Sequence, residues 1–305
     1  MNEKLRIGVM VSAGGGLAKI TDRARKHAPY GFAHYWLAQP FGVDVLTALA
    51  LIAPHLPEAE LGTAVIPIYG RHPLTLAMQA LTTQAATGGR LALGIGLSHQ
   101  FVIENIFGMP FTRPARHMRE YVSALAPLLR REKVEYAGET VRVNTVMGPL
   151  DVGDATPPRL LLAALGPVML DIAGRMADGT ITWMTGARTL ASHTVPTITA
   201  AARAAGRPAP RILAGLPVCV TSDVDAARKL ASEQLAVYRS LPFYRAMMDR
   251  EGAADPVDIA QIGDRAALQA LVQRLRDAGV TDLLASVVGP PATWTPTLES
   301  LAELK

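Results

Sequence analysis

The alternation of two hydrophobic patterns along the whole chain is the feature that most constrains its fold. Apolar runs of strand length, rich in valine, isoleucine and leucine, alternate with segments in which apolar residues recur at helical spacing. The helical pattern is clear where Leu74, Met78, Leu81 and Ala85 form one stripe. The predicted strands are residues 6–11, 33–38, 61–68, 91–95, 159–164, 179–184, 212–220 and 282–287.

Helices are predicted between these strands, and their ends carry recognisable signals. Asp44 and Asp264 are suited to cap two helices, Pro73 fits a first turn, and Gly88 with Gly89 ends the same helix. In the last pair the predicted helix precedes its strand. The predicted helices are residues 17–28, 44–53, 73–86, 114–129, 167–176, a segment ending near 205, a segment beginning at 223, and 264–278.

Short connections between strands and helices indicate an α/β fold with a parallel sheet. Eight successive units without a break in composition favour closure into a (β/α)8 TIM barrel over an open doubly wound sheet. Two segments depart from the repeat: residues 134–143 are typical of a hairpin, and residues 241–262 form a predicted insertion before the last helix. Because no linker rich in serine or proline divides the chain, we predict one barrel domain over residues 1–305.

Composition excludes several functional classes. The formal charge is only +4, from 30 Lys and Arg against 26 Asp and Glu, so a nucleic-acid surface is not expected. No apolar run approaches the roughly 20 residues of a membrane span, and no secretion signal is visible, so we expect a cytoplasmic protein. The single cysteine, Cys219, lies in an apolar run and excludes a disulfide framework. The seven histidines lack metal-ligand spacing, and we predict no metal site.

Loops at the carboxyl ends of the strands are where a parallel barrel builds its active site. Gly166-Pro167 and Thr185-Gly186 follow neighbouring strands and present free backbone N–H groups that suit a phosphate, although each also fits an ordinary strand-to-helix turn. His99, after the fourth strand, either moves a proton or is structural. Gly94 and Gly96 leave room for a flat ligand, and the position of His99 disfavours a Rossmann nicotinamide site.

Four segments carry a resemblance to a known family. The chain resembles the luciferase-like flavin and deazaflavin oxidoreductases (the luciferase-like monooxygenase superfamily), particularly the branch that uses coenzyme F420. The order and spacing of the segments, from the first predicted strand to the last, make the match specific. The segments are 61–65 with Arg71-His72-Pro73, 88–96, 113–121, and 164–179.

The resemblance implies a (β/α)8 barrel that holds a tricyclic ring at its C-terminal mouth. It implies a bulge after the third strand, with a cis peptide at Ala64–Val65, that supports one face of the ring. The turns at Gly166 and at Thr185-Gly186 match the family's positions for the phosphate-bearing tail. The cofactor-binding residues that it implies are Gln39, Ala64, Val65, Ile66, Gly96, Leu97, Ser98, His99, Ala164, Leu165, Gly166, Pro167, Thr185 and Gly186.

The catalytic positions depart from the family's sugar-phosphate dehydrogenase branch. The Asp-His pair of that branch corresponds to Gln39-Pro40, and its carboxylate corresponds to His99, so His99 and Gln39 are the candidate catalytic residues. Gln39 cannot exchange a proton at neutral pH, which makes alcohol oxidation doubtful. A reductase in which His99 delivers or relays a proton to an uncharged organic substrate fits better. The predicted apolar walls of its pocket are Trp36, Phe41, Phe101 and Trp183.

Two alternatives to an F420-dependent oxidoreductase remain open. The first is an FMN-dependent monooxygenase of the same superfamily, and the second is a non-catalytic deazaflavin-binding protein that lacks turnover. The predicted partner is a small-molecule substrate, with no nucleic acid and no membrane. The apolar helices 45–53 and 74–86 either form the face of a homodimer, as in relatives, or pack on the barrel.

Overall fold

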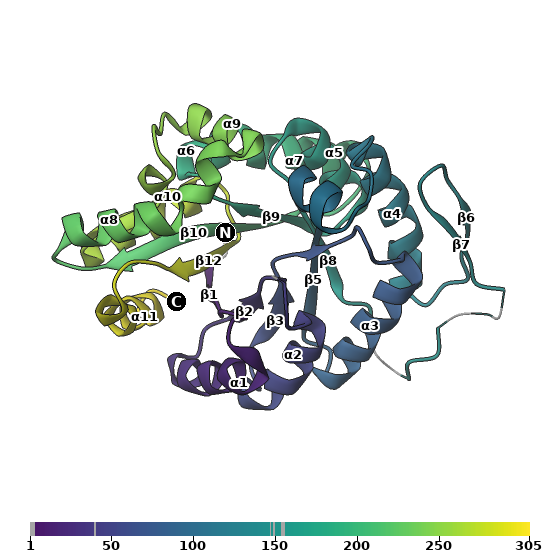
Figure 1. Ribbon diagram of the computed structural model, residues 1–305, viewed down its shortest axis with the longest axis horizontal. Coiled ribbons are helices and arrows are strands. Elements are labelled where there is room, and N and C mark those ends of the chain that lie inside the picture. Colours follow the sequence, from purple (N-terminus) through teal and green to yellow (C-terminus); the bar gives the residue numbers. More distant parts are fainter. Residues whose placement is uncertain (1–3, 40, 147, 149, 154–155) are drawn as a thin grey trace.

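Eight parallel strands close into a barrel in the computed structural model, which describes residues 4–305 except residues 40, 147, 149, 154 and 155 (Figure 1). Neighbouring strands follow the chain order, and the last barrel strand returns to pair with the first. The predicted α/β barrel is therefore confirmed. Its strands are β1 (Arg6–Met10), β2 (His34–Leu37), β3 (Glu60–Thr63), β5 (Leu91–Gly96), β8 (Arg159–Ala163), β9 (Gly179–Trp183), β10 (Arg211–Val220) and β12 (Asp282–Val287).

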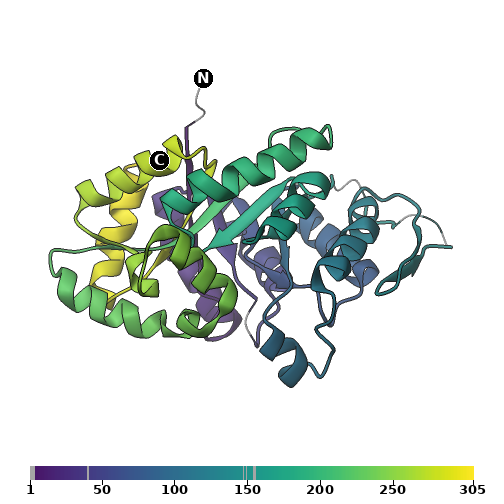
Figure 2. The same ribbon diagram turned by 90° about the horizontal axis from the view of Figure 1, so that it is seen from above.

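The helices surround this barrel, and two of them, α9 (Pro242–Glu251) and α11 (Trp294–Ala302), were not predicted from the sequence (Figures 1 and 2). The predicted last helix, α10 (Arg265–Asp277), follows β10, and α11 follows β12. Only Thr297, Leu298 and Leu301 of α11 are buried, so its apolar stripe is weak. The other helices are α1 (Gly16–His27), α2 (Val45–Ile52), α3 (Pro73–Ala86), α4 (Pro114–Leu129), α5 (Pro167–Met176), α6 (Ala187–Thr189), α7 (Val195–Ala204) and α8 (Val224–Gln234).

The predicted third strand is divided into two pieces. After β3 the chain leaves the sheet at Ala64 and Val65, whose peptide bond is cis as the resemblance implies, and returns as β4 (Ile66–Pro67). Ile66 then pairs with Ile95 of β5. The interruption turns Ala64 and Val65 out of the ladder, and both residues are half-buried at the mouth of the barrel.

Both predicted excursions contain regular structure. Within the first, β6 (Glu135–Ala137) pairs antiparallel with β7 (Arg142–Asn144). The second contains α9, which ends at Gly252 in a left-handed conformation with φ 79°. It continues to β11 (Gln261–Gly263), a short strand that pairs in parallel with the carboxyl end of β10, at Val218–Val220. Helix α9 consequently lies at the carboxyl end of the barrel, near α6 (Figure 1).

The interior of the barrel has an apolar layer and a charged base. The apolar cluster consists of Trp36, Ala92, Leu161, Ile181, Leu213 and Leu284. Below it, the first residues of five strands are joined by ion pairs and by a hydrogen bond between His34 and Asp282; these residues are Arg6, His34, Glu60, Arg211 and Asp282. In barrels of this kind the amino ends of the strands serve stability and the carboxyl ends serve function.

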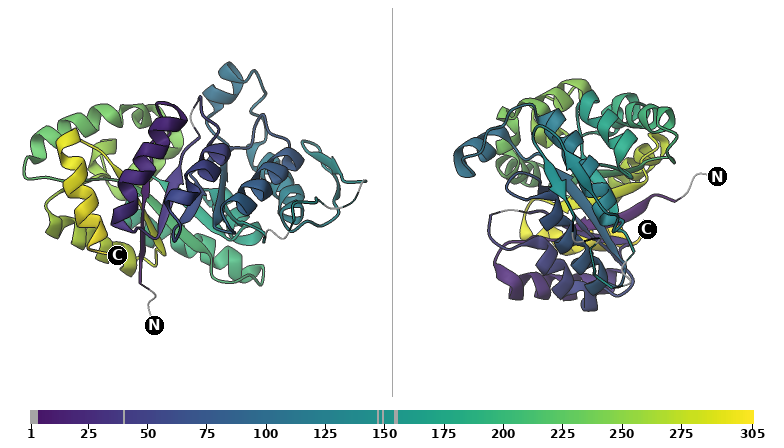
Figure 3. Two further views of the ribbon diagram at one scale, coloured as in Figure 1. Left: turned by 90° about the horizontal axis from the view of Figure 1, so that it is seen from below. Right: turned by 90° about the vertical axis from the view of Figure 1, so that its right-hand side faces the viewer.

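The two ends of the described chain lie on one flank. Helices α1 and α11 run side by side there (Figures 1 and 3), and the Lys305 ammonium donates hydrogen bonds to the Tyr30 and Gly31 carbonyls. In the described part of the chain, no helix is both long and apolar enough to cross a membrane.

Candidate active site

A cavity of about 710 Å³ opens at the carboxyl ends of the barrel strands. Its walls come from the ends of β1, β2, β5, β8, β9 and β12, from the β3–β4 turn, and from the beginnings of α4, α5 and α9. Among the described residues that line it there is no aspartate, glutamate, lysine or arginine. The cavity is therefore apolar, with its polar atoms supplied by backbone, hydroxyl and aromatic groups.

Most of the sequence-predicted site residues meet in this cavity. They come from three places far apart in the sequence: the β3–β4 turn, the loop after β5, and the turn between β8 and α5. The predicted residues that line the cavity are Ala64, Val65, Gly96, Leu97, Ser98, His99, Ala164, Leu165, Gly166 and Pro167.

The glycines of β5 serve packing between strands. A Cβ at Gly94 would lie 2.0 Å from the Thr63 carbonyl oxygen, and a Cβ at Gly96 would lie 2.7 Å from a methyl group of Val65. The interpretation that these glycines leave room for a flat ligand is therefore wrong, because protein atoms fill both spaces. Their smallness lets the β3–β4 turn approach β5 and places Val65 at the cavity floor.

Two predicted site residues point elsewhere. Ile66 is fully buried in the core. The Gln39 amide donates to the Val43 carbonyl at 3.1 Å and accepts from the Val45 backbone N–H at 3.0 Å, so it organises the chain entering α2. Neither residue lines the cavity. Pro40, the other half of the substituted catalytic pair, lies outside the described residues.

The second predicted phosphate cradle is filled by a carboxylate of the same chain. Glu251, the last residue of α9, accepts hydrogen bonds from the backbone N–H groups of Arg188 and Thr189 at 3.2 and 2.7 Å, and from the Thr189 hydroxyl at 2.6 Å. A Cβ at Gly186 would lie 2.2 Å from the Glu251 carboxyl carbon. Thr185 and Gly186 are buried and do not line the cavity. The backbone N–H groups that bind Glu251 thus belong to Arg188 and Thr189, just after the predicted Thr185-Gly186 turn, and the carboxylate occupies the space beside that turn.

The first predicted phosphate cradle, in contrast, faces the cavity. Gly166 precedes α5 as its N-cap residue, and no side chain caps the helix there. A Cβ at Gly166 would have no heavy atom within 4 Å. Gly166, Pro167, Val168 and Met169 all line the cavity. An open helix N-terminus of this kind supplies backbone donors and a positive dipole end for an anionic group.

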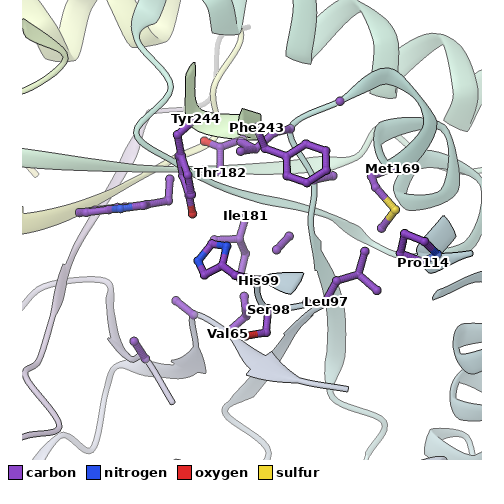
Figure 4. A pocket seen from close by; sticks show the side chains of 18 of the residues that line it. Val65, Leu97, Ser98, His99, Pro114, Met169, Ile181, Thr182, Phe243 and Tyr244 are labelled. Atoms are coloured by element: carbon purple, nitrogen blue, oxygen red, sulfur yellow. The ribbon is translucent and has the colours of Figure 1, made fainter. Parts of the chain in front are cut away.

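His99 and Tyr244 face each other from two sides of the cavity (Figure 4). Their ring centroids are 6.0 Å apart. Burial lowers the pKa of His99, which keeps the imidazole neutral at pH 7, and no charged side chain opposes this effect. Burial, with a smaller contribution from Tyr238, raises the pKa of the Tyr244 phenol. Both groups are therefore neutral hydrogen-bonding groups.

The walls differ from those predicted. Trp183 lines the cavity, but Trp36 lies in the barrel interior, where its indole N–H donates to His34 Nδ1 at 2.7 Å. Phe41 and Phe101 are 65% and 67% exposed and lie outside the cavity lining.

Sequence reasoning missed the aromatic residues near and within the insertion. Tyr238 precedes α9, Phe243 and Tyr244 lie on its first turn, and all three line the cavity. The available signal was three aromatic residues within seven positions of a chain that is only 5% aromatic. Among the described residues, no group of three histidine, cysteine or acidic side chains is placed to hold a metal ion.

Comparison with known proteins gives matches over most of the chain. An uncharacterized protein of Mycobacterium tuberculosis is 31% identical over 252 residues, 78% of this chain and 74% of that protein. The 5,10-methylenetetrahydromethanopterin reductase of Methanolobus tindarius is 27% identical over 252 residues, 80% of this chain and 74% of that enzyme.

The fold has solved counterparts. The coenzyme F420-dependent tetrahydromethanopterin reductase of Methanopyrus kandleri superposes with a TM-score of 0.82, covering 99% of this chain and 97% of that chain at 22% identity. A family model described as luciferase-like monooxygenase matches residues 4–304. The chain therefore belongs to the luciferase-like monooxygenase family of oxidoreductases.

Proposed function

We propose that this protein is a coenzyme F420-dependent oxidoreductase that transfers a hydride from the reduced deazaflavin to an uncharged organic substrate. The observation that carries the proposal is the cavity itself, which joins an open helix N-terminus at one end to a region without charged side chains at the other. Similarity to a methylenetetrahydromethanopterin reductase supports the choice of a reductase.

The residues present fit a planar cofactor with an anionic tail. Val65 and Ala64, turned out of the ladder, offer an apolar surface to one face of a ring, and the cavity volume is in the range of small-molecule sites. The backbone N–H groups of Gly166, Val168 and Met169 at the start of α5 would hold the phosphate. Of the two predicted phosphate turns, the one at Gly166 is open, and Glu251 occupies the one at Gly186.

The protein contributes orientation, exclusion of water and neutral hydrogen-bonding groups to the reaction. A reduced deazaflavin supplies the hydride when it is bound, and the surrounding protein determines what it can reach. His99, held neutral by burial, is placed to donate from its ring N–H or to relay a proton to the product. In the described part of the chain no carboxylate lines the cavity to act as a base toward an alcohol, which favours reduction over alcohol oxidation.

Substitution of Gly166 tests the proposed cofactor site. Gly166 has φ −82° and ψ 160°, a conformation that N-cap asparagine and aspartate adopt readily, so Gly166→Asn and Gly166→Asp should both fold. The aspartate places a negative charge where the phosphate would bind. Titration with coenzyme F420, followed by fluorescence, should give at least about tenfold weaker binding for Gly166→Asp than for Gly166→Asn. Equal affinity of the two variants would contradict the phosphate site.

The same titration with FMN addresses an FMN-dependent monooxygenase, the second candidate. The family description and the shared barrel mouth favour it as an alternative. Tight binding of FMN by the wild-type protein, with none for coenzyme F420, would select this alternative.

A non-catalytic deazaflavin-binding protein is the third candidate. It is motivated by Gln39, which replaces a catalytic residue of the family and whose amide is hydrogen-bonded to the backbone at the start of α2. Cofactor affinity without reduction across a panel of enones, imines and quinones would select it.

The remaining proposals concern the setting of the enzyme. We propose a cytoplasmic protein whose partner is a small-molecule substrate, with neither nucleic acid nor a membrane involved.

Leu51 on α2 and Met78 on α3 are 46% and 51% exposed, and we propose that these helices contact a second copy of the chain in a homodimer. Light scattering coupled to gel filtration tests this, with Leu51→Glu expected to give a monomer.

A further inference from the structure

We infer that the substrate is a neutral carbonyl compound whose oxygen is bound between the phenol of Tyr244 and the imidazole of His99. The inference rests on the proposed function and adds the class of substrate and the residue that recognises it. Tyr244 belongs to α9, so this phenol comes from the insertion and not from a strand of the barrel.

Two neutral donors converge at this end of the cavity. Figure 4 shows the phenol hydroxyl of Tyr244 directed into the cavity from α9, with the His99 ring across from it. The ring centroids are 6.0 Å apart, and the planes are inclined by 57°. Because the phenol stays protonated at neutral pH and His99 is uncharged, each can donate a hydrogen bond to the same acceptor.

A third polar group lacks a partner in the same region. Thr182 of β9 is 1% exposed and lines the cavity, and among the described residues no group makes a hydrogen bond with its hydroxyl. Thr182 and Tyr244 both line this cavity and are labelled in Figure 4. A buried hydroxyl without a partner costs free energy, so a polar ligand atom in this region would be favoured.

The surroundings of the two rings offer no counter-ion to an ionised substrate group. Among the described residues no lysine or arginine lines the cavity, and no charged side chain contributes to the pKa shifts of His99 or Tyr244. A carboxylate placed here would lose its hydration without gaining a counter-ion. The aromatic rings of Trp183, Tyr238 and Phe243 complete the walls and fit an apolar body around one oxygen atom.

Tyr244 is held in place from the far end of its helix. Its ring packs edge-on against Tyr238 at 4.9 Å between centroids, and Glu251, seven residues further along α9, binds the N-terminus of α6. These contacts hold Tyr244 in position relative to α6 and, through Tyr238 and Trp183, to β9, and a substrate-recognising side chain needs such support.

Binding of three matched probes to the full-length protein tests the inference. The probes are trans-4-phenyl-3-buten-2-one, which is neutral; cinnamate, its carboxylate counterpart; and 1-phenyl-1-butene, which has no oxygen. Calorimetric titration is performed with and without oxidised coenzyme F420. We expect the ketone to bind at least about tenfold more tightly than cinnamate, and Tyr244→Phe to weaken ketone binding about fivefold while leaving the hydrocarbon unchanged.

Tyr30→Phe is the control for loss of a phenol hydroxyl, because Tyr30 lies on the flank near α11 and outside the cavity lining. Melting temperatures and circular dichroism show whether each variant is folded. Cinnamate binding as tightly as the ketone, or an unchanged ketone affinity in folded Tyr244→Phe, would overturn the inference. Failure of coenzyme F420 to bind would instead count against the proposed function, since the probe preferences are also measured without it.

Discussion

At the scale of single residues, position after a strand predicted the location of His99 but not that of Gln39. His99 was expected at the mouth of the barrel because it follows the fourth predicted strand, and it does line the cavity. Gln39 also follows a strand, yet its amide is bound to the backbone at the start of α2. The difference lies in local hydrogen bonding, because a free N–H and a free carbonyl near Gln39 satisfy the amide before a ligand can.

The protonation of His99 should appear in the pH dependence of turnover. Burial lowers its pKa from 6.5, so the imidazole is neutral above that value and gains a proton only as the pH falls below it. We expect kcat/KM for a neutral ketone to be constant at about pH 7 to 8 and to rise on the acid side, because the protonated imidazole is the stronger proton donor to the product oxygen. His99→Gln, which cannot titrate, should lower turnover and remove the acid limb. An acid limb of unchanged midpoint in folded His99→Gln would contradict the role of His99.

At the scale of elements, one carboxylate joins the insertion to the barrel. Glu251 ends α9 and accepts three hydrogen bonds from α6, while the first turn of α9 carries Phe243 and Tyr244 into the cavity. This arrangement couples the placement of the aromatic wall to an acidic residue that does not line the cavity. The sequence showed the helix N-terminus at Gly186 but not the group that would occupy it.

Glu251→Gln should therefore destabilise the protein and weaken substrate binding together. A glutamine retains one acceptor oxygen and loses the charge, so we expect a loss of about 1 kcal/mol in the free energy of unfolding, since the site is partly exposed. Asp249→Asn on the same helix is the matched control. Asp249 forms an exposed pair with Arg245, and we expect a change of at most about 0.5 kcal/mol. Thermal unfolding and ketone titration measure both effects, and equal behaviour of the two variants would contradict the coupling.

At the scale of the whole molecule, the base of the barrel is closed by a buried ionic network. Asp282 is 1% exposed and pairs with Arg211 at 2.6 Å and with His34 at 3.3 Å, and Arg211 also meets Glu60 at 2.7 Å. The Arg211 guanidinium lies 5.7 Å from the centre of the Trp36 ring. The network ties β2, β3, β10 and β12 together at the end opposite the cavity, so its loss should open the barrel.

Acid should weaken the fold through this network in two steps. Burial lowers the pKa of His34 and outweighs the opposing effect of Asp282, so the unfolded chain takes up this proton first as the pH falls below about 6.5. The pKa of Asp282 is held far below its ordinary value by hydrogen bonds from His34 and Arg211, which outweigh burial. Its contribution is complete above about pH 4 and is lost as the pH falls further.

Urea unfolding from about pH 8 down to pH 3 should therefore show a gradual loss of stability below pH 6.5 that steepens below pH 4. Asp282→Asn should cost about 3 kcal/mol at neutral pH, because buried Arg211 loses one of its two counter-ions and keeps only Glu60, and should reduce the steep part of the acid dependence. A stability profile of Asp282→Asn that is parallel to that of the wild-type protein would show that the network does not control acid unfolding.

The sequence alone determined the closed barrel, because the repeat of short apolar runs and amphipathic segments admits few other arrangements, and a parallel sheet built this way needs helices around it. It also determined which strand ends meet, since all carboxyl ends of a parallel barrel face the same side. Tertiary structure decided what occupies each of those ends. Glu251 reaches Gly186 from 65 residues further along the chain, and Val65 and the Thr63 carbonyl fill the space beside Gly96 and Gly94. Such competition between a ligand and the chain for the same donors and the same space depends on distances that only the packed molecule fixes.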